Sequence, residues 1–273
     1  MKHYKIINNS IQNNQILQNG GGGLNILSYN VSWEAMTSTT TGNMKLCKSD
    51  GLGGGICKTN ILDNISSNLK KYKPDIACFQ EASDYEDIVD LFDNSIYENF
   101  VNMSDKELML TLWNKKKFNL VKSFYGEFEE GRPFAIIILK QKNKNIALIN
   151  LHAGHKINTQ TSIFEILNNF IKTNITYSIK KSITRVIMSG DFNRDVYEDE
   201  NSNYTIKFID EFELKRSSNN KNTCCSPLGY GHKFNYDHVL DSKAAMVKKI
   251  VGNSLKSYKY PASDHVLIVV NIK

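Results

Sequence analysis

The chain has 273 residues, of which 41% are hydrophobic and 23% charged, and its formal net charge is +6. This size and apolar fraction suit one globular domain, and the modest basic excess favours an anionic partner. No segment approaches the roughly 20 apolar residues that a membrane-spanning helix needs, and the N-terminus lacks the apolar core of a secretory signal. We therefore expect no membrane span and an intracellular location, cytoplasmic or nuclear.

The first 23 residues differ in composition from the rest of the chain. They are rich in Asn, Gln and Ile and end in four consecutive glycines. Such segments bury little apolar surface and order poorly. We predict a flexible N-terminal tail over residues 1–23 and a single folded domain over residues 24–273.

From Leu24 onward, short apolar runs alternate with turn residues and a few helical segments. Several runs are apolar throughout, which indicates strands buried on both faces, so helices must cover the sheets. The pattern predicts an α/β (α+β) fold. The expected strands are 24–32, 75–80, 108–114, 118–124, 134–140, 146–153, 185–192, 236–241 and 265–272.

Three segments have the apolar spacing of helices. Residues 60–71 place Ile61, Ile65 and Leu69 on one stripe, residues 161–172 repeat apolar side chains at helical spacing, and residues 85–92 form a short helix. Between Glu34 and Lys58 lies a long Gly/Ser/Thr-rich segment directly after the first strand. We expect this segment to be a loop and a candidate lid.

The chain has five cysteines, an odd number that does not indicate a disulfide framework and fits a reducing compartment. We expect free thiols. A zinc site is the alternative if two loops meet, although no CxxC pair is present to form half of it. Its ligands would be Cys47, Cys57, Cys224 and Cys225, with His232 nearby.

Polar side chains recur where apolar strands end. Each alone has an ordinary explanation, as a solvated turn residue or a hydrogen-bonded structural histidine. Together they predict one site, because a buried scaffold holds polar groups rigidly around one spot. The residues are Asn30, Gln80, Glu81, His152, Asp191, Asn193, Asp264 and His265, and Asp237 adds a further carboxylate.

The order of these motifs resembles the endonuclease/exonuclease/phosphatase superfamily, the fold of deoxyribonuclease I. The shared order is an Asn on the first strand, a QE pair, a strand ending in His, GDFN, a strand opened by Asp, and SDH. The resemblance spans Leu24 to Ile272. It implies a four-layer, two-sheet sandwich of mixed β-strands flanked by helices, and a metal-dependent phosphodiesterase.

Phosphodiester hydrolysis requires charge neutralisation, an activated water and support for the leaving oxygen. Glu81, with Asn30 and Asp264 close by, is the expected Mg²⁺ site, because this ion prefers carboxylate and amide oxygens, and Mn²⁺ could substitute. Asp191 is expected to orient and deprotonate the attacking water. Asn193 is expected to donate a hydrogen bond to a phosphate oxygen.

The resemblance also implies roles for two histidines. His265 would contact the scissile phosphate, with Asp237 holding its ring through the second nitrogen. His152 would contact the phosphate or protonate the leaving group. Two departures are evident: Ser32 stands where some members place an Asp, which disfavours two metals, and His238 stands where many have Arg, which weakens assignment to a subfamily.

Three function classes remain open from the sequence. We prefer a nuclease acting on DNA or RNA, end-processing such as tyrosyl-DNA phosphodiesterase activity included, because the chain is basic and has no apolar run suited to membrane docking. A sphingomyelinase or an inositol-phosphate phosphatase is the alternative within the same fold. An inactive binding module is the third, and the complete set of motif residues argues against it.

Overall fold

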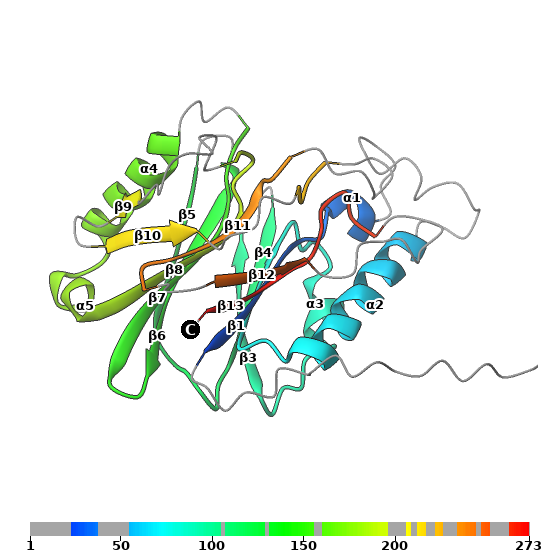
Figure 1. The fold of residues 1–273 in the computed structure, drawn as a ribbon, viewed down its shortest axis with the longest axis horizontal. Helices are drawn as coiled ribbons and strands as arrows, with labels where there is room; N and C mark the ends of the chain where they lie inside the picture. The colour runs from blue at the N-terminus through cyan, green and yellow to red at the C-terminus, as the bar shows by residue number, and fades with distance from the viewer. Residues whose placement is uncertain are drawn as a thin grey trace, which may run out of the picture.

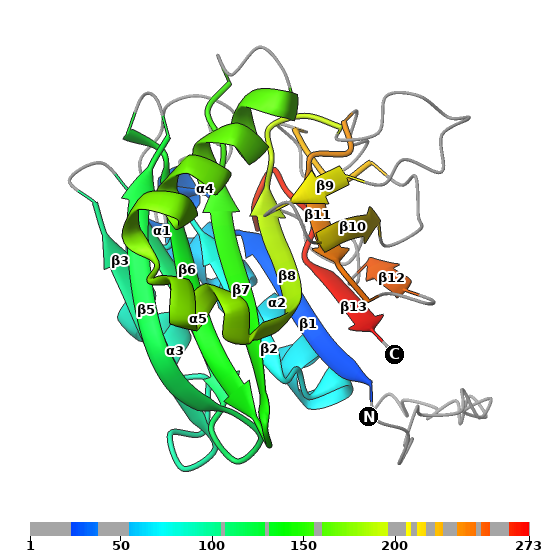
Figure 2. The ribbon, with the colours of Figure 1, turned by 90° about the vertical axis from the view of Figure 1, so that its left-hand side faces the viewer.

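In the computed structural model, two mixed β-sheets pack face to face and helices cover their outer faces (Figures 1 and 2). This is the two-sheet sandwich that the sequence predicts. None of the described helices is long and apolar enough to cross a membrane. Nearly all of the predicted tail lies outside the described residues. These are 23–37, 55–104, 107–128, 131–155, 160–195, 206–208, 212–216, 222–225, 234–243, 247–251 and 262–272.

The first sheet has the strand order β12-β13-β1-β2-β4-β3 within the described ranges. Only β1 and β2 pair in parallel there, with Asn30 opposite Gln80. The first two motifs therefore end at one edge. The strands are β1 (Leu24–Asn30), β2 (Ile76–Gln80), β3 (Tyr97–Met103), β4 (Leu108–Asn114), β12 (Val247–Val251) and β13 (Ile268–Ile272); the helices are α1 (Trp33–Met36), α2 (Gly55–Tyr72) and α3 (Tyr85–Val89).

The second sheet has the described order β5-β6-β7-β8-β11-β10-β9, and its parallel pair is β7 with β8. His152 on β7 lies opposite Asp191 on β8, and Asp191 lies opposite Asp237 on β11. The strand register alone thus places three predicted site residues next to one another. The strands are β5 (Asn119–Glu127), β6 (Pro133–Gln141), β7 (Lys144–His152), β8 (Ile183–Asp191), β9 (Ile206–Phe208), β10 (Phe212–Arg216) and β11 (Asp237–Asp241); the helices are α4 (Gln160–Asn174) and α5 (Tyr177–Ser182).

An apolar layer fills the space between the sheets. Ile76 and Trp113 of the first sheet share one buried cluster with Leu148, Ile187 and Val239 of the second. Removal of this surface from water stabilises the sandwich by about 25 cal/mol for each Å² buried.

Asn150 is one of the described polar side chains that cross this apolar layer. The amide of Asn150, on β7, accepts a hydrogen bond from Gln80 Nε2 (2.7 Å) and donates to Thr111 Oγ1 (3.0 Å) and the Leu110 carbonyl (3.2 Å). A buried amide without partners costs free energy, so these bonds favour one stacking of the two sheets. They lie directly beneath the strand ends that carry the motifs.

The helices confirm the predicted apolar stripes but begin and end elsewhere. Ile61 and Ile65 of α2 are buried, as are Ile163 and Leu167 of α4. Helix α2 begins at Gly55, so the predicted loop to Lys58 is wrong at that end. Burial of Cys57 there outweighs the weak helix propensity of one glycine, about 1 kcal/mol.

Other predicted boundaries also need correction. The predicted loop between Glu34 and Lys58 is also wrong at its start, because α1 extends to Met36, and residues 38–54 lie outside the described ranges. The third helix ends at Val89, and the last strand starts at Ile268 because the preceding residues turn into the site. The strands β3, β9, β10 and β12 were not predicted; β3 is a sheet edge with exposed Glu98 and Asn99, which weaken its apolar signal.

Gly190, directly before Asp191, links the fold to the site, and we predict that Gly190→Ala destabilises the protein. Its φ is +145°, and an added Cβ would collide with the Leu151 carbonyl of the adjacent strand. Strain and overpacking together should cost at least about 2 kcal/mol. Urea unfolding measures this. Gly55→Ala is the control, because nothing lies within 4 Å of its added Cβ. Equal stabilities of the two variants would contradict the prediction.

Candidate active site

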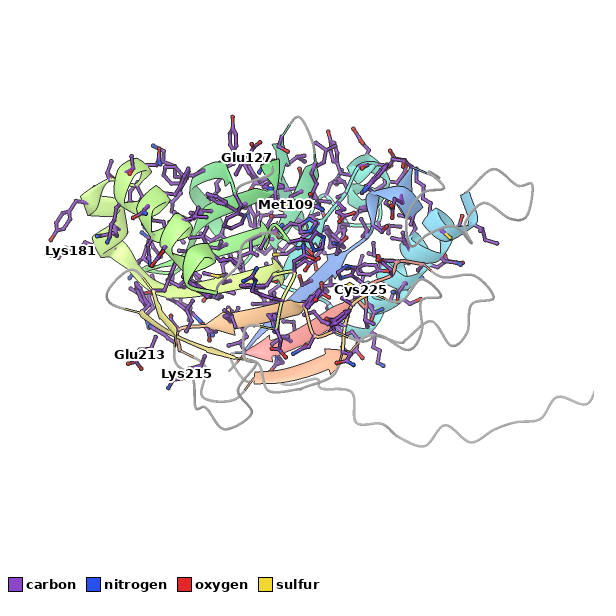
Figure 3. All side chains as sticks on the ribbon, turned by 90° about the horizontal axis from the view of Figure 1, so that it is seen from above. Met109, Glu127, Lys181, Glu213, Lys215 and Cys225 are labelled. Atoms are coloured by element: carbon purple, nitrogen blue, oxygen red, sulfur yellow. A yellow bond between two sulfur atoms is a disulfide. The ribbon has the colours of Figure 1, made fainter. Side chains whose placement is uncertain are left out.

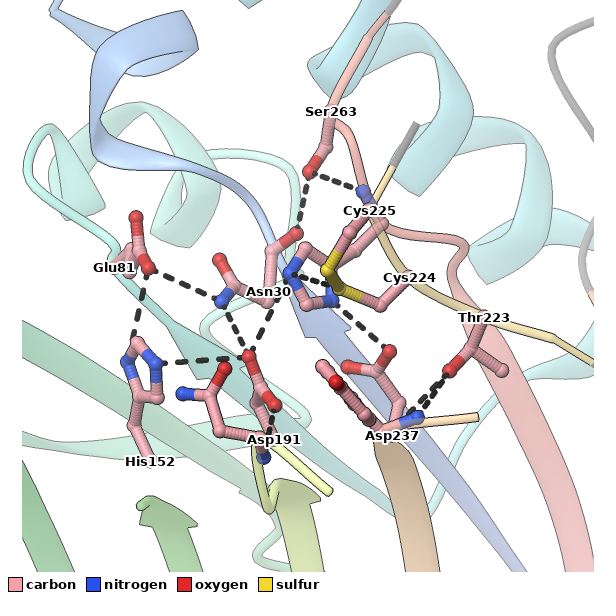
Figure 4. The surroundings of a disulfide bond; sticks show 12 residues. Asn30, Glu81, His152, Asp191, Thr223, Cys224, Cys225, Asp237 and Ser263 are labelled. Atoms are coloured by element: carbon pink, nitrogen blue, oxygen red, sulfur yellow. Dashed lines mark hydrogen bonds and ion pairs between the residues drawn. A yellow bond between two sulfur atoms is a disulfide. The ribbon is translucent and has the colours of Figure 1, made fainter. Parts of the chain in front are cut away.

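The predicted site residues meet at the edge where β1, β2, β7 and β8 end and β11 begins (Figure 4). The two sheets each contribute. Asn30 and Glu81 come from the first sheet, and His152, Asp191 and Asp237 come from the second. His265 joins them from the segment before β13.

Asp191 lies at the centre of this cluster and is buried. Its Oδ2 accepts a hydrogen bond from Asn30 Nδ2 (3.0 Å) and lies 3.6 Å from His152 Nε2 and 3.5 Å from His265 Nε2. Burial raises the pKa of Asp191, but the positive charges of His265 and His152 outweigh burial and hold this pKa below its usual value. The Asp191 carboxylate is therefore ionised at neutral pH.

His265 is oriented by Asp237. Its Nδ1 lies 3.0 Å from Asp237 Oδ2, so its Nε2 faces Asp191. Burial lowers the pKa of His265, but the charges of Asp237 and Asp191 outweigh it, and the pKa lies well above its ordinary value. The ring is thus a cation at neutral pH. Burial raises the pKa of Asp237.

His152 is oriented in the same way by Glu107, which the sequence analysis missed. Glu107 Oε1 lies 2.7 Å from His152 Nδ1, and its Oε2 accepts a hydrogen bond from Arg132 Nη1 (2.8 Å). Burial lowers the pKa of His152, but the charges of Glu107, Asp191 and Glu81 outweigh it, and the pKa is raised. Two histidine–carboxylate pairs therefore face one aspartate.

Topology explains why Glu107 and Arg132 were missed. Each precedes an apolar strand, whereas the sequence analysis considered strand ends. β4 is antiparallel to β2, and β6 is antiparallel to β7, so the starts of β4 and β6 lie beside the ends of β2 and β7. Charged residues just before those two strands were the available signal.

Glu81 lies at the opening of the cluster, with its side chain 13% exposed. Its Oε1 accepts a hydrogen bond from Asn30 Nδ2 (3.2 Å), and its Oε2 accepts one from the Trp33 backbone amide (3.0 Å). Arg132 Nη1 lies 3.6 Å from Oε1. The carboxylate is held in place but reaches solvent.

Several residues here have a backbone conformation that non-glycine residues rarely adopt. The φ angles of Ser32, Glu81, Asn193 and Cys225 are 58°, 56°, 51° and 79°. Each such residue costs about 1–3 kcal/mol, and such strain gathers at functional sites. The surrounding packing and hydrogen bonds stabilise these turns.

Two predicted residues are placed differently from the others. Asn193, predicted to bind phosphate, donates from Nδ2 to the Ala153 carbonyl (2.7 Å), and its backbone amide donates to Asp191 Oδ1 (2.7 Å). Asp264 lies on the His265 side, where its charge raises the pKa of that ring and its carbonyl accepts a hydrogen bond from the Cys225 amide. Its role as a metal ligand remains a prediction.

Among the described residues, two groups of side chains have ligand atoms close enough to hold a metal ion. One comprises Asp191, Asp237 and His265, and the other comprises Cys224, Cys225 and His265; within each, all ligand atoms lie within 4.8 Å of one another. The first group overlaps the predicted catalytic residues. It does not contain the predicted magnesium ligands, Asn30, Glu81 and Asp264.

The expectation of free thiols is wrong for three cysteines. Cys224 and Cys225 form a disulfide with each other, and Cys57 is disulfide-bonded as well. Cys78 is free and buried, and burial raises its pKa to about 12. Sequence spacing does not signal a bond between adjacent residues. The alternative zinc ligands Cys47 and His232 lie outside the described residues.

No protein-family model matches the sequence. An uncharacterized protein of Acanthamoeba polyphaga mimivirus is 30% identical to it over 262 residues, which cover 90% of this chain and 50% of the relative. The chain therefore spans about half the length of that relative.

Solved structures share the fold at low sequence identity. D. rerio TDP2, complexed with a single-strand DNA product, matches with a TM-score of 0.63 at 16% identity over 92% of this chain and 99% of that one. Two Bacteroides thetaiotaomicron proteins also match with TM-scores of 0.63. One is an endonuclease/exonuclease/phosphatase family protein (17% identity; 92% and 97% of the chains), and the other is a mannosyl-6-phosphatase (16%; 92% and 100%). The chain therefore has the deoxyribonuclease I-like fold of the endonuclease/exonuclease/phosphatase superfamily, as its motifs predict.

Proposed function

We propose that this protein is a metal-dependent phosphate ester hydrolase. The observation that carries the proposal is the position of Asp191 Oδ2, 3.6 Å from His152 Nε2 and 3.5 Å from His265 Nε2. A carboxylate flanked by two imidazole cations suits the attack of water on a phosphate ester. The ionised carboxylate can hold the water, and the cations can face the phosphate oxygens.

The two histidines would neutralise the charge that otherwise repels the water. Both have raised pKa values, which favours the ring form that carries a proton on Nε2. Each ring keeps its orientation through the carboxylate on its Nδ1, Glu107 for His152 and Asp237 for His265. Either ring could then give its Nε2 proton to the leaving oxygen, and we assign this role to His152.

The main role of Asp191 would be to orient the attacking water. Its lowered pKa keeps it ionised, which allows it to accept a hydrogen bond from the water. A low pKa also makes it a weak base, so proton transfer to Asp191 would follow, rather than precede, the attack on phosphorus.

The residues at the opening of the site fit a hard divalent cation. Glu81 offers a carboxylate that reaches solvent. Asn30 lies beside it, with Nδ2 donating to Glu81 and Oδ1 accepting a hydrogen bond from the Ser32 amide (2.9 Å), so its amide would turn to present the oxygen to an ion. Oxygen donors of this kind suit Mg²⁺, and also Mn²⁺. When bound, such an ion would neutralise charge on the phosphate oxygens. We propose that Glu81 and Asn30 hold it, with Asp264 as a further candidate.

For the substrate we propose a nucleic acid, DNA or RNA. The net charge of +6 and the solved TDP2 complex with single-stranded DNA support this choice. The similarity to a mannosyl-6-phosphatase favours a small phosphate ester as the second candidate. The assembled cluster argues against an inactive binding module, because the side chains of four of the five predicted catalytic residues, His152, Asp191, Asp237 and His265, face one another in it.

Lysine clusters limit how a strand could bind. Lys70 and Lys71 lie in the last turn of α2, Lys73 follows it, and Lys115–Lys117 follow β4. The pairing of Ile76 with Trp113 places both clusters at the sheet edge opposite Glu81. Lys181 and Lys215 lie far from Cys225 (Figure 3). Near the site, Arg132 contacts the carboxylates of Glu81 and Glu107.

We predict that hydrolysis requires a divalent cation and that Asp191→Asn lowers kcat by at least about a hundredfold, because the group that orients the water is lost. Glu81→Gln should raise the Mg²⁺ concentration needed for half-maximal rate, since an amide carries no charge. The measurement is hydrolysis of labelled DNA, RNA and a phosphate monoester with Mg²⁺ or EDTA. Asp63→Asn, on an exposed face of α2, is the control. Full activity in EDTA would refute metal dependence.

We predict that Glu107→Gln lowers the pKa of His152. The charge of Glu107 counteracts burial in the wild type, and its loss leaves burial to favour the neutral ring. At neutral pH the variant should therefore lose the proton that His152 supplies. NMR titration of the histidine ring protons in EDTA measures this pKa. Glu98→Gln, at an exposed position on β3, should leave it unchanged. An unchanged His152 pKa in Glu107→Gln would show that Glu107 only packs.

We predict that an oligonucleotide binds more tightly than a mononucleotide and that log affinity falls with log salt by about 0.7 for each contacted phosphate of a single strand. The protein for this measurement is Asp191→Asn, which should bind without cutting. Triple replacement of Lys70, Lys71 and Lys73 by Ala should leave the slope unchanged, because these side chains lie at the opposite edge. Equal, salt-insensitive affinities, with faster hydrolysis of a sugar phosphate, would favour the second candidate.

A further inference from the structure

The disulfide between Cys224 and Cys225 lies against the catalytic cluster (Figure 4). Cys224 is fully buried and pairs through its backbone with Phe234 and His265. The Cys225 amide donates to the Asp264 carbonyl (3.1 Å). The backbone thus fixes both cysteines beside His265, and the hydrolytic roles proposed above leave both sulfur atoms unused.

The sulfur and nitrogen atoms of this group converge. Cys224 Sγ lies 3.3 Å from His265 Nε2, and the two sulfurs and a ring nitrogen of His265 all lie within 4.8 Å of one another. Two sulfurs that are bonded to each other point the same way. After reduction they need little movement to contact one ion together with the imidazole.

A second observation supports ligation by His265. Its Nδ1 is held by Asp237 Oδ2 at 3.0 Å, which leaves Nε2 directed towards Cys224 Sγ. A carboxylate on the far nitrogen is the usual partner of a metal-binding histidine, because it fixes the ring and raises its basicity. Once Nε2 has given up its proton, the pair Asp237–His265 therefore presents this nitrogen as an oriented ligand.

We propose that reduced Cys224 and Cys225, together with His265 Nε2, bind a soft divalent cation of the zinc class. Two thiolates and one imidazole suit zinc or cadmium and suit Mg²⁺ poorly. This set of ligands differs from the oxygen donors at Glu81 and Asn30. With three protein ligands, a fourth position remains for water.

The disulfide must first be reduced. Two equivalents of a small thiol such as glutathione supply two electrons and two protons, so the S–S bond breaks, Cys224 and Cys225 become thiols, and the small thiols become one disulfide. Binding of the cation then releases the two thiol protons and the Nε2 proton of His265 to water. The disulfide form has no free thiolate and does not offer this site.

Occupation of the site would affect hydrolysis. The ion engages the Nε2 that is otherwise directed at Asp191 and the phosphate. The cation should therefore inhibit the reduced enzyme even with excess Mg²⁺. This consequence rests on the proposed function, whereas the binding site itself does not.

Cadmium titration of the full chain tests the binding site directly, through the ultraviolet charge-transfer band of cadmium thiolates. The reduced protein, freed of reductant without oxygen, should bind Cd²⁺ with this band, and Zn²⁺ should compete for it. Cys225→Ser should lower the affinity at least tenfold. Cys57→Ser is the matched control, because it removes a different disulfide and leaves this set of ligands intact.

Two further comparisons separate the possible outcomes. Oxidised wild-type protein should show no cadmium–thiolate band. This comparison does not need the Cys225 variant, so it tests the site even if that variant fails to fold. Equal Cd²⁺ binding by the oxidised and reduced proteins, or by Cys225→Ser and Cys57→Ser, would overturn the proposal. Hydrolysis is measured in a separate assay, in which Zn²⁺ should inhibit the reduced wild-type protein and should not inhibit reduced Cys225→Ser. If the band forms as expected but the protein hydrolyses no phosphate ester, the metal site stands and the proposed function fails.

Discussion

The site depends on how the two sheets stack, and the hydrogen bonds of the Asn150 amide favour one stacking. It joins β7 to both β2 and β4 inside a mainly apolar layer. Apolar packing alone tolerates sliding, because it has no direction, whereas a buried amide must meet particular partners. Asn150 lies two residues before His152, and Gln80 lies one before Glu81. The bond between them sets the spacing of the two halves of the site.

The parallel strand pairs determine which residues reach that edge. Only where two strands run in parallel do their carboxyl ends coincide, and each sheet has one such pair among its described strands. The antiparallel neighbours begin at the same edge. They bring Glu107, Arg132 and Asp237 beside the strand-end residues. Residues distant in sequence thus form histidine–carboxylate pairs without any long loop having to fold over the site.

The same geometry explains what the sequence could predict. Asn30, His152 and Asp191 were identified because each ends an apolar strand, a local signal. Glu107, the partner of His152, was not identified, because it is 45 residues from His152 in the sequence and their contact depends on strand order. The edge strand β3 was missed because one face is solvated. The Cys224–Cys225 bond was missed because pairing rules assume separated cysteines, and only the fold places these two against His265.

His265 Nε2 is where the two proposed chemistries compete. It lies 3.5 Å from Asp191 Oδ2 and 3.3 Å from Cys224 Sγ, so oxygen and sulfur partners both face one nitrogen. A protonated Nε2 can donate to a phosphate oxygen, whereas an Nε2 bound to a soft cation has no proton to give. Asp237 serves both states, because it orients the ring through the other nitrogen. The oxidation state of the cysteine pair would therefore determine whether a soft cation can take this histidine from hydrolysis.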